Sequence, residues 1–83
     1  MRYADSHCTY TEDATHYTFT GMCIQTKRMH SVRIPKAELY AYRQGAYIQD
    51  AMPSVSAEDR EFLMSGLSPE GWKLVLPPDL VED

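Results

Sequence analysis

Cysteine and histidine are the side chains in this 83-residue sequence that could hold a metal or supply a nucleophile and a base. Cys8, His16, Cys23 and His30 offer the ligand types that suit zinc. Their spacings are wide and irregular, without the close Cys-x-x-Cys or His-x-x-x-His pairs of a zinc motif. Alternation along a strand expected at residues 15–26 also puts His16 and Cys23 on opposite faces. We therefore expect no metal and no cofactor, and keep a small zinc-binding domain as an alternative.

Covalent catalysis by Cys23 would need an exposed, electropositive thiol beside a histidine base. Cys23 lies in an apolar strand pattern, so we expect a buried thiol that behaves as a small hydrophobe. Acidic groups at 12–13, 58–61 and 82–83 lie at chain ends or helix starts, where they complement the helix dipole or face solvent. The four glycines are isolated, so there is no phosphate-binding loop. The sequence predicts no catalytic residue and a protein that is not an enzyme.

Basic side chains gather around residues 27–36, in contrast to the acidic ends of the chain and its net charge of -4. A basic hairpin could track phosphates, whereas a solvated strand face would explain the same charges. The negative net charge disfavours non-specific attachment to nucleic acid or to an anionic membrane. Nucleic-acid binding is therefore the alternative function, and it would use Lys27, Arg28, Arg33 and Lys36, with His30 beside them.

Six tyrosines and five methionines exceed what so small a core can bury, and both residue types are enriched at protein interfaces. Some of them should be exposed. A self-interface that forms a homodimer would satisfy the same observation. The predicted contact patch consists of Tyr40, Tyr42, Tyr47, Met29 and Met52.

The elements that must position these side chains can be predicted from periodicity. Residues 15–26 alternate strictly, and Gly21 within them indicates a bulge or a close backbone approach. Residues 27–30 form a basic tip, and the second strand, residues 31–35, ends at Pro35. Helices are expected from residue 35 to 44, from 46 to 52, from about Ala57 and from about Pro69. The fold class is α+β, with a short antiparallel β-hairpin or a three-stranded sheet packed against three to four short helices.

The run 59–72 combines helix start and stop signals. Ser56 and Asp59 have capping-box spacing, and Gly66 ends that helix. Ser68 and Pro69 then start the last helix, which carries Trp72 as the expected clamp of the corner. Phe62, Gly66, Pro69 and Trp72 are thus the predicted structural residues. The expected core is Tyr17, Phe19, Cys23, Val32, Ile34, Leu39, Ile48, Phe62, Leu63, Leu67, Trp72 and Val75.

The chain is divided by composition into three parts. Residues 1–14 are polar and lack sustained periodicity. Partial disorder is one interpretation of this segment, and a short strand in "HCTYT" is the other. Residues 15–78 form a single α+β domain, and residues 79–83 form an acidic tail. No apolar run is long enough to span a bilayer and no secretory signal is recognisable, so we expect a cytoplasmic protein without membrane contact.

The segments "IQDAMP" and "REFLMSGLSPEGW" resemble a group of small phage and prophage proteins, over roughly residues 17–75. The resemblance implies phage origin and the α+β fold, and no reaction. Some members carry a Cys-x-x-Cys-like pair where this chain has Ser68 and Gly71, so a metal there is not supported. Together with the exposed aromatic residues, the resemblance predicts a protein-interaction module that binds and inhibits a host protein of antiphage defence. Its motif residues here are Gly45, Gln49, Pro53, Arg60, Gly66, Pro69 and Trp72.

Overall fold

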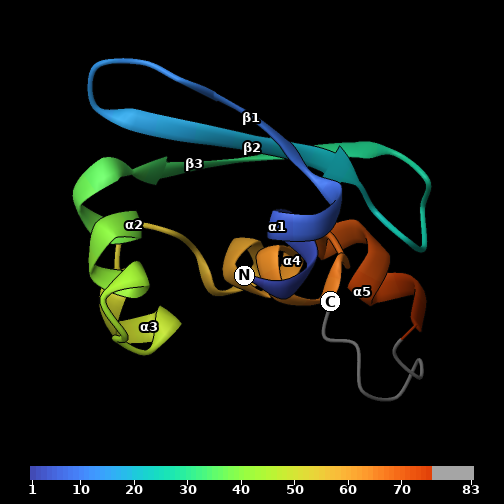
Figure 1. The fold of residues 1–83 in the computed structure, drawn as a ribbon. Coiled ribbons are helices and arrows are strands. Elements are labelled where there is room, and N and C mark those ends of the chain that lie inside the picture. The colour runs from blue at the N-terminus through green and yellow to red at the C-terminus, as the bar shows by residue number, and fades with distance from the viewer. Residues whose placement is uncertain (76–83) are drawn as a thin grey trace.

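The structure, a computed structural model, describes residues 1–75. The predicted acidic tail at 79–83 and the end of the predicted domain lie outside the described residues. A three-stranded antiparallel sheet has the order β1-β2-β3, and the helices lie on one of its faces (Figure 1). The α+β class is thereby confirmed. The strands are β1 (Thr9–Glu12), β2 (His16–Met22) and β3 (Met29–Pro35), and the helices are α1 (Arg2–His7), α2 (Lys36–Arg43), α3 (Ile48–Ala51), α4 (Ala57–Ser65) and α5 (Pro69–Val75).

The central strand β2 sets the two faces of the sheet. Its register pairs Phe19 with Tyr10 of β1 and with Val32 of β3, so these three side chains share the face that the helices cover. Thr9 and Thr11 of β1 and Thr18 and Thr20 of β2 lie on the opposite face, which we call the threonine face. The predicted strand at 15–26 ends earlier, at Met22, because the Cys23 N–H and C=O bond to Arg28 and Lys27 and close a tight turn.

The predicted helix boundaries around the last corner are confirmed. Ser56 Oγ accepts a hydrogen bond from the Asp59 N–H at 3.2 Å, as the capping-box spacing requires. Gly66 ends α4 with a φ of 84°, a left-handed conformation that favours glycine. Ser68 Oγ accepts from the Gly71 N–H at 3.1 Å and caps the first turn of α5.

Residues 1–14 differ from the prediction of a partly disordered segment, because they form α1 and β1. Met1 and Ala4 are buried, and Cys8 packs against the same core. Residues 1, 4 and 8 follow the spacing of one helix face, and this face packs against the core. Three apolar residues among polar neighbours form too weak a pattern to outweigh the surrounding composition.

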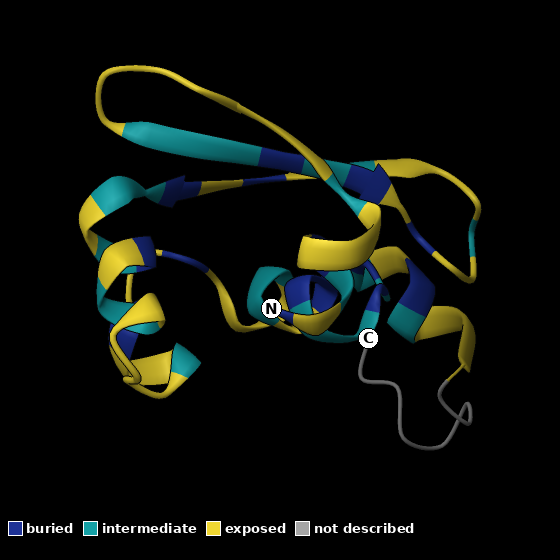
Figure 2. Cartoon of the chain, in the orientation of Figure 1, coloured by how far each residue is buried: buried dark blue, intermediate teal, exposed yellow. Residues whose placement is uncertain are grey.

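The core is confirmed at seven of its predicted positions and wrong at Trp72 and Val75. Trp72 is only half-buried and lies outside the buried cluster, and Val75 is exposed. The buried residue of α5 is Gly71, where a Cβ would lie 2.6 Å from Cys23 Sγ. α5 therefore approaches that sulfur closely, and buried, half-buried and exposed residues follow one another along this helix (Figure 2). Buried as predicted are Phe19, Cys23, Val32, Ile34, Leu39, Phe62 and Leu63; half-buried are Tyr17, Ile48 and Leu67; buried but not predicted are Met1, Ala4, Ala51, Met52 and Val55.

Candidate functional site

A groove of about 590 Å³ opens between α1, α2 and the helix-covered face of the sheet. This volume lies within the range of about 300–1,000 Å³ that ligand pockets occupy. We call it the aromatic groove. Its lining residues are Ala4, Asp5, Cys8, Tyr10, Tyr17, Phe19, Lys36, Leu39, Tyr40 and Arg43.

Three aromatic rings from neighbouring strands form one wall of the aromatic groove. Tyr10 of β1 lies with its ring centroid 5.5 Å from that of Phe19 and 5.7 Å from that of Tyr17, the second pair edge to face. The Phe19 side chain is buried, whereas the Tyr10 side chain is 61% exposed. The register places Tyr10 directly opposite Phe19, so the strand pairing itself fixes this wall.

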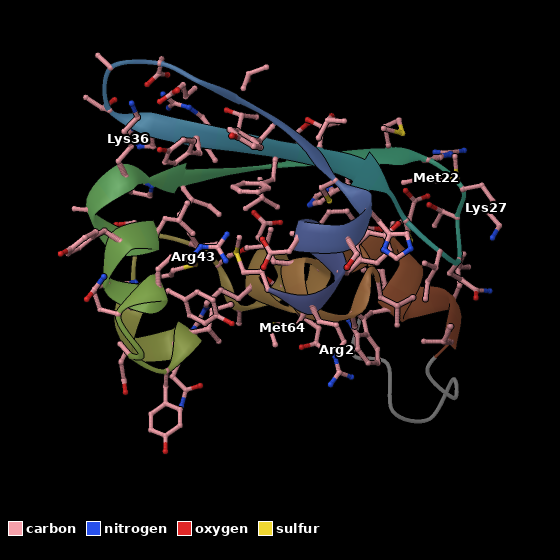
Figure 3. The ribbon with its side chains drawn as sticks, in the orientation of Figure 1. Arg2, Met22, Lys27, Lys36, Arg43 and Met64 are labelled. Atoms are coloured by element: carbon pink, nitrogen blue, oxygen red, sulfur yellow. The ribbon has the colours of Figure 1, made fainter. Side chains whose placement is uncertain are left out.

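Ion pairs fix the rim of the aromatic groove. Arg43 reaches from α2 toward α1 and donates to both Asp5 oxygens, at 2.8 and 3.1 Å (Figure 3). Lys36 Nζ lies 2.8 Å from a Glu12 oxygen and 5.3 Å from the centre of the Tyr17 ring. The hydrogen bond that Lys36 donates to the Glu12 carboxylate raises the pKa of Lys36. Both cations therefore line the groove while paired with carboxylates, and Lys36 also lies over the Tyr17 ring.

Acid is expected to weaken the contact between α1 and α2 through Asp5. Hydrogen bonds from Arg43 hold the pKa of Asp5 below its ordinary value of 3.8, against the opposing effect of burial. Because the folded pKa is lowered, the stabilisation is complete above the ordinary pKa and is lost as the pH falls through the folded value. Urea midpoints measured from neutral to strongly acidic pH should therefore fall more steeply for the wild type than for Asp5→Asn.

The matched control for this measurement is Asp50→Asn in α3. The Asp50 carboxylate is exposed and makes no ion pair within residues 1–75. Its removal should leave the shape of the acid curve as in the wild type. Parallel curves for the wild type and Asp5→Asn would contradict the assigned role of the ion pair.

The predicted contact patch is not brought together as one surface. Tyr40 is 67% exposed and lines the aromatic groove, and Tyr47 is 75% exposed beside α3. Tyr42 is half-buried, with its hydroxyl 2.9 Å from the Met1 amine. Met29 is exposed and is the first residue of β3, whereas Tyr40 and Tyr42 belong to α2, which begins after the last residue of that strand. The length of β3 therefore separates Met29 from these two tyrosines. Met52 is fully buried against the core, so its place in an exposed patch was wrong.

The predicted basic residues are spread along the length of β3 and carry partners. Arg33 lies 3.0 Å from Asp13, and Lys36 lies at the same end with Glu12. At the other end Arg28 faces Glu70 at 3.5 Å, and Lys27 donates to the Ile24 carbonyl. Lys27 and Lys36 are labelled at opposite ends of the molecule (Figure 3). These four residues form no continuous track for phosphates.

The residues considered for chemistry are separated by the sheet. His16 lies on the threonine face, where its Nδ1 is 2.7 Å from Thr15 Oγ1. His30 lies on the helix-covered face, with Nε2 at 2.8 Å from Asp59 Oδ1 and its ring edge-on to Phe62 at 4.9 Å. Within residues 1–75 no thiol or hydroxyl is hydrogen-bonded to His30, and no three His, Cys, Asp or Glu side chains gather as metal ligands.

Cys23 is buried, as predicted, and its sulfur is a hydrogen-bond acceptor. Sγ receives the N–H groups of Ser68 at 3.4 Å and Thr26 at 3.5 Å. Burial raises the pKa of this thiol, but the hydrogen bonds outweigh it and lower the pKa to about 6. These two hydrogen bonds connect the 23–28 turn to the start of α5. Cys23 is fully buried, so its sulfur is not exposed to a substrate.

Tyr10 and Cys8 of the aromatic groove were missed from the sequence. The alternation of Thr9, Tyr10 and Thr11 beside the similar Thr18, Phe19 and Thr20 was the available signal, since paired strands place like side chains on one face. Cys8 lines the groove as a half-buried free thiol. Burial raises its pKa, and the Asp5 carboxylate adds to this effect.

Comparisons with protein-family models, with curated proteins and with solved structures found no match to this chain. The resemblance to phage proteins and the functions that it implies therefore stay predictions. Among residues 1–75, no helix combines the length and the apolar character needed to cross a bilayer.

Proposed function

We propose that the chain is a non-enzymatic protein-interaction module, and that it binds its partner through the aromatic groove. The observation that carries the proposal is the placement of two largely exposed tyrosines, Tyr10 of β1 and Tyr40 of α2, in the lining of the aromatic groove. Tyrosine is among the residues that contribute most to binding energy, especially beside a pocket that a partner side chain can fill.

The chemistry of the groove favours an apolar side chain of the partner. More than half of its lining residues are apolar or aromatic, and its charged residues form ion pairs. The apolar and aromatic residues other than Tyr40 are Ala4, Tyr10, Tyr17, Phe19 and Leu39. Lys36 and Arg43 are already paired with carboxylates, so they orient a polar backbone or side chain rather than supply an unpaired charge. The resemblance adds the finer proposal that the partner is a bacterial host protein whose defence role is blocked.

Affinity capture from a bacterial lysate, followed by titration of the captured protein, tests the proposal. The groove variant is Tyr10→Ala with Tyr40→Ala, and the matched control is Tyr47→Ala, another exposed tyrosine outside the groove. We expect the groove variant to lose at least about 30-fold in affinity and the control to bind like the wild type. Unchanged circular dichroism and urea midpoints would show that both variants are folded.

Alkylation of Cys8 gives a second readout of the same site. Cys8 lines the groove, whereas Cys23 is closed to solvent, so a maleimide should label Cys8 first in the native protein. A bound partner should slow that labelling, and prior labelling should weaken binding. Equal binding by the groove variant and the wild type, with Cys8 equally reactive in the complex, would refute the proposal.

A further inference from the structure

The strand β3 is an open edge of the sheet. The Cys23–Arg28 hydrogen bond and the Lys36–Thr15 hydrogen bond fix the alternation between β2 and β3, so residues 30, 32 and 34 bond to β2. Met29, Ser31 and Arg33 therefore direct their N–H and C=O groups away from β2. Within residues 1–75 no hydrogen bond reaches these groups.

Exposed apolar side chains lie beside this open edge. Met29 is 62% exposed, and the register places Met22, 46% exposed, directly opposite it on the threonine face. Ile24, which follows in the turn, is 47% exposed. These three exposed apolar residues lie at the end of the β2–β3 pair opposite to Pro35.

β3 lacks most of the devices that keep an edge strand from pairing. It runs seven residues in continuous register, and its proline, Pro35, lies only at the end. Arg33 is the one charged residue of the strand apart from its histidine, and Asp13 neutralises it. The other edge strand, β1, has four residues. By the same alternation, only Tyr10 and Glu12 direct their backbone N–H and C=O groups away from β2.

We propose that β3 pairs with β3 of a second copy of this chain, antiparallel and with Ser31 on the two-fold axis. In this register Ser31 faces Ser31 of the second copy, and Met29 faces Arg33 of the second copy. All outward N–H and C=O groups of the three residues are then paired, and no like charges stand opposite each other. Such a self-complementary patch is what a two-fold interface requires.

A second copy fits this edge better than a flexible peptide does. A peptide must be ordered into a strand when it binds, whereas β3 is already held by β2 and brings no such cost. Met29 of each copy, 62% exposed in the single chain, then faces Arg33 of the other copy, so part of its apolar surface is covered. The inference is independent of the proposed function, because no residue of the aromatic groove lies on β3.

Light scattering and sedimentation of the full chain over a range of concentrations test the inference. The wild type should be a dimer at millimolar concentration. Ser31→Pro removes an N–H that β2 does not use, so it should keep the fold and be monomeric. Ser31→Lys and Ser31→Glu each place like charges on the axis and should raise the dimer dissociation constant about fivefold or more.

Mixing the lysine and glutamate variants supplies the decisive measurement, because opposite charges then face each other and a heterodimer should form in native mass spectrometry. Thr11→Lys is the matched control, since it makes the same charge change on the same face of the other edge strand. A wild type that stays monomeric at millimolar concentration would overturn the inference. So would a dimer that dissociates with Thr11→Lys and persists with Ser31→Pro. Neither outcome would bear on partner capture by the aromatic groove.

Discussion

Phe62→Ala is expected to lower the free energy of unfolding by about 3–5 kcal/mol, the usual loss for a buried aromatic residue. Phe62 is fully buried in α4. Its ring meets Tyr3 of α1 edge-on at 5.7 Å and His30 of β3 at 4.9 Å. One side chain thus joins the helix layer to the sheet, and its removal leaves a cavity that three elements would have to close together.

Trp72→Ala is the comparison that makes this prediction specific. The indole is larger than the phenyl ring, but it is half-buried and lies outside the core cluster. We expect a loss of about 1–2 kcal/mol, because only part of its apolar surface leaves water on folding. Urea denaturation with a check that the m-value is unchanged measures both variants. A larger loss for Trp72→Ala than for Phe62→Ala would contradict the observed core.

Gly21→Ala is expected to destabilise the fold by about 1–3 kcal/mol, as overpacking in a filled core does. A Cβ at Gly21 would lie 2.5 Å from Cys8 Sγ, and the next nearest Cys8 atoms are at an ordinary 3.5 Å. The steric conflict therefore comes from a single sulfur atom. It would displace the end of α1, which also positions Asp5 and Cys8 in the aromatic groove.

A double-mutant cycle isolates that contact. In a Cys8→Ala background the sulfur is absent, so the same Gly21→Ala change should cost far less, and the two substitutions should be strongly non-additive. Denaturation of the wild type, both single variants and the double variant provides the four free energies. Additive effects would show that α1 does not approach β2 as closely as the structure places it.

Local signals in the sequence predicted the elements that depend on local chemistry. The Ser56 cap, the left-handed Gly66 and the Ser68–Pro69 start each depend on a few neighbouring residues, and each was confirmed. Gly21 was correctly expected to mark a bulge or a close approach. The continuous register of β2 with β3 shows the second, with Cys8 as the approaching group.

Features that depend on contacts distant in the sequence were not predictable in the same way. Trp72 was expected inside because of its size, but the space beside α5 is set by the approach of Gly71 to Cys23, far away in the chain. The aromatic groove likewise depends on α1 docking beside β2, which residues 1–14 do not reveal by composition. Met52 was assigned to the surface by residue type alone, whereas its position between α3 and α4 buries it.

The position of helix α1 at the start of the chain has a consequence for how any groove ligand would act. α1 forms one wall of the hollow, so a molecule seated there bridges the first residues of the chain and its middle. A ligand that binds only the folded chain stabilises it by mass action. A saturating concentration of such a ligand should therefore raise the melting temperature. A thermal-shift screen would in this way detect occupants without any knowledge of their biology.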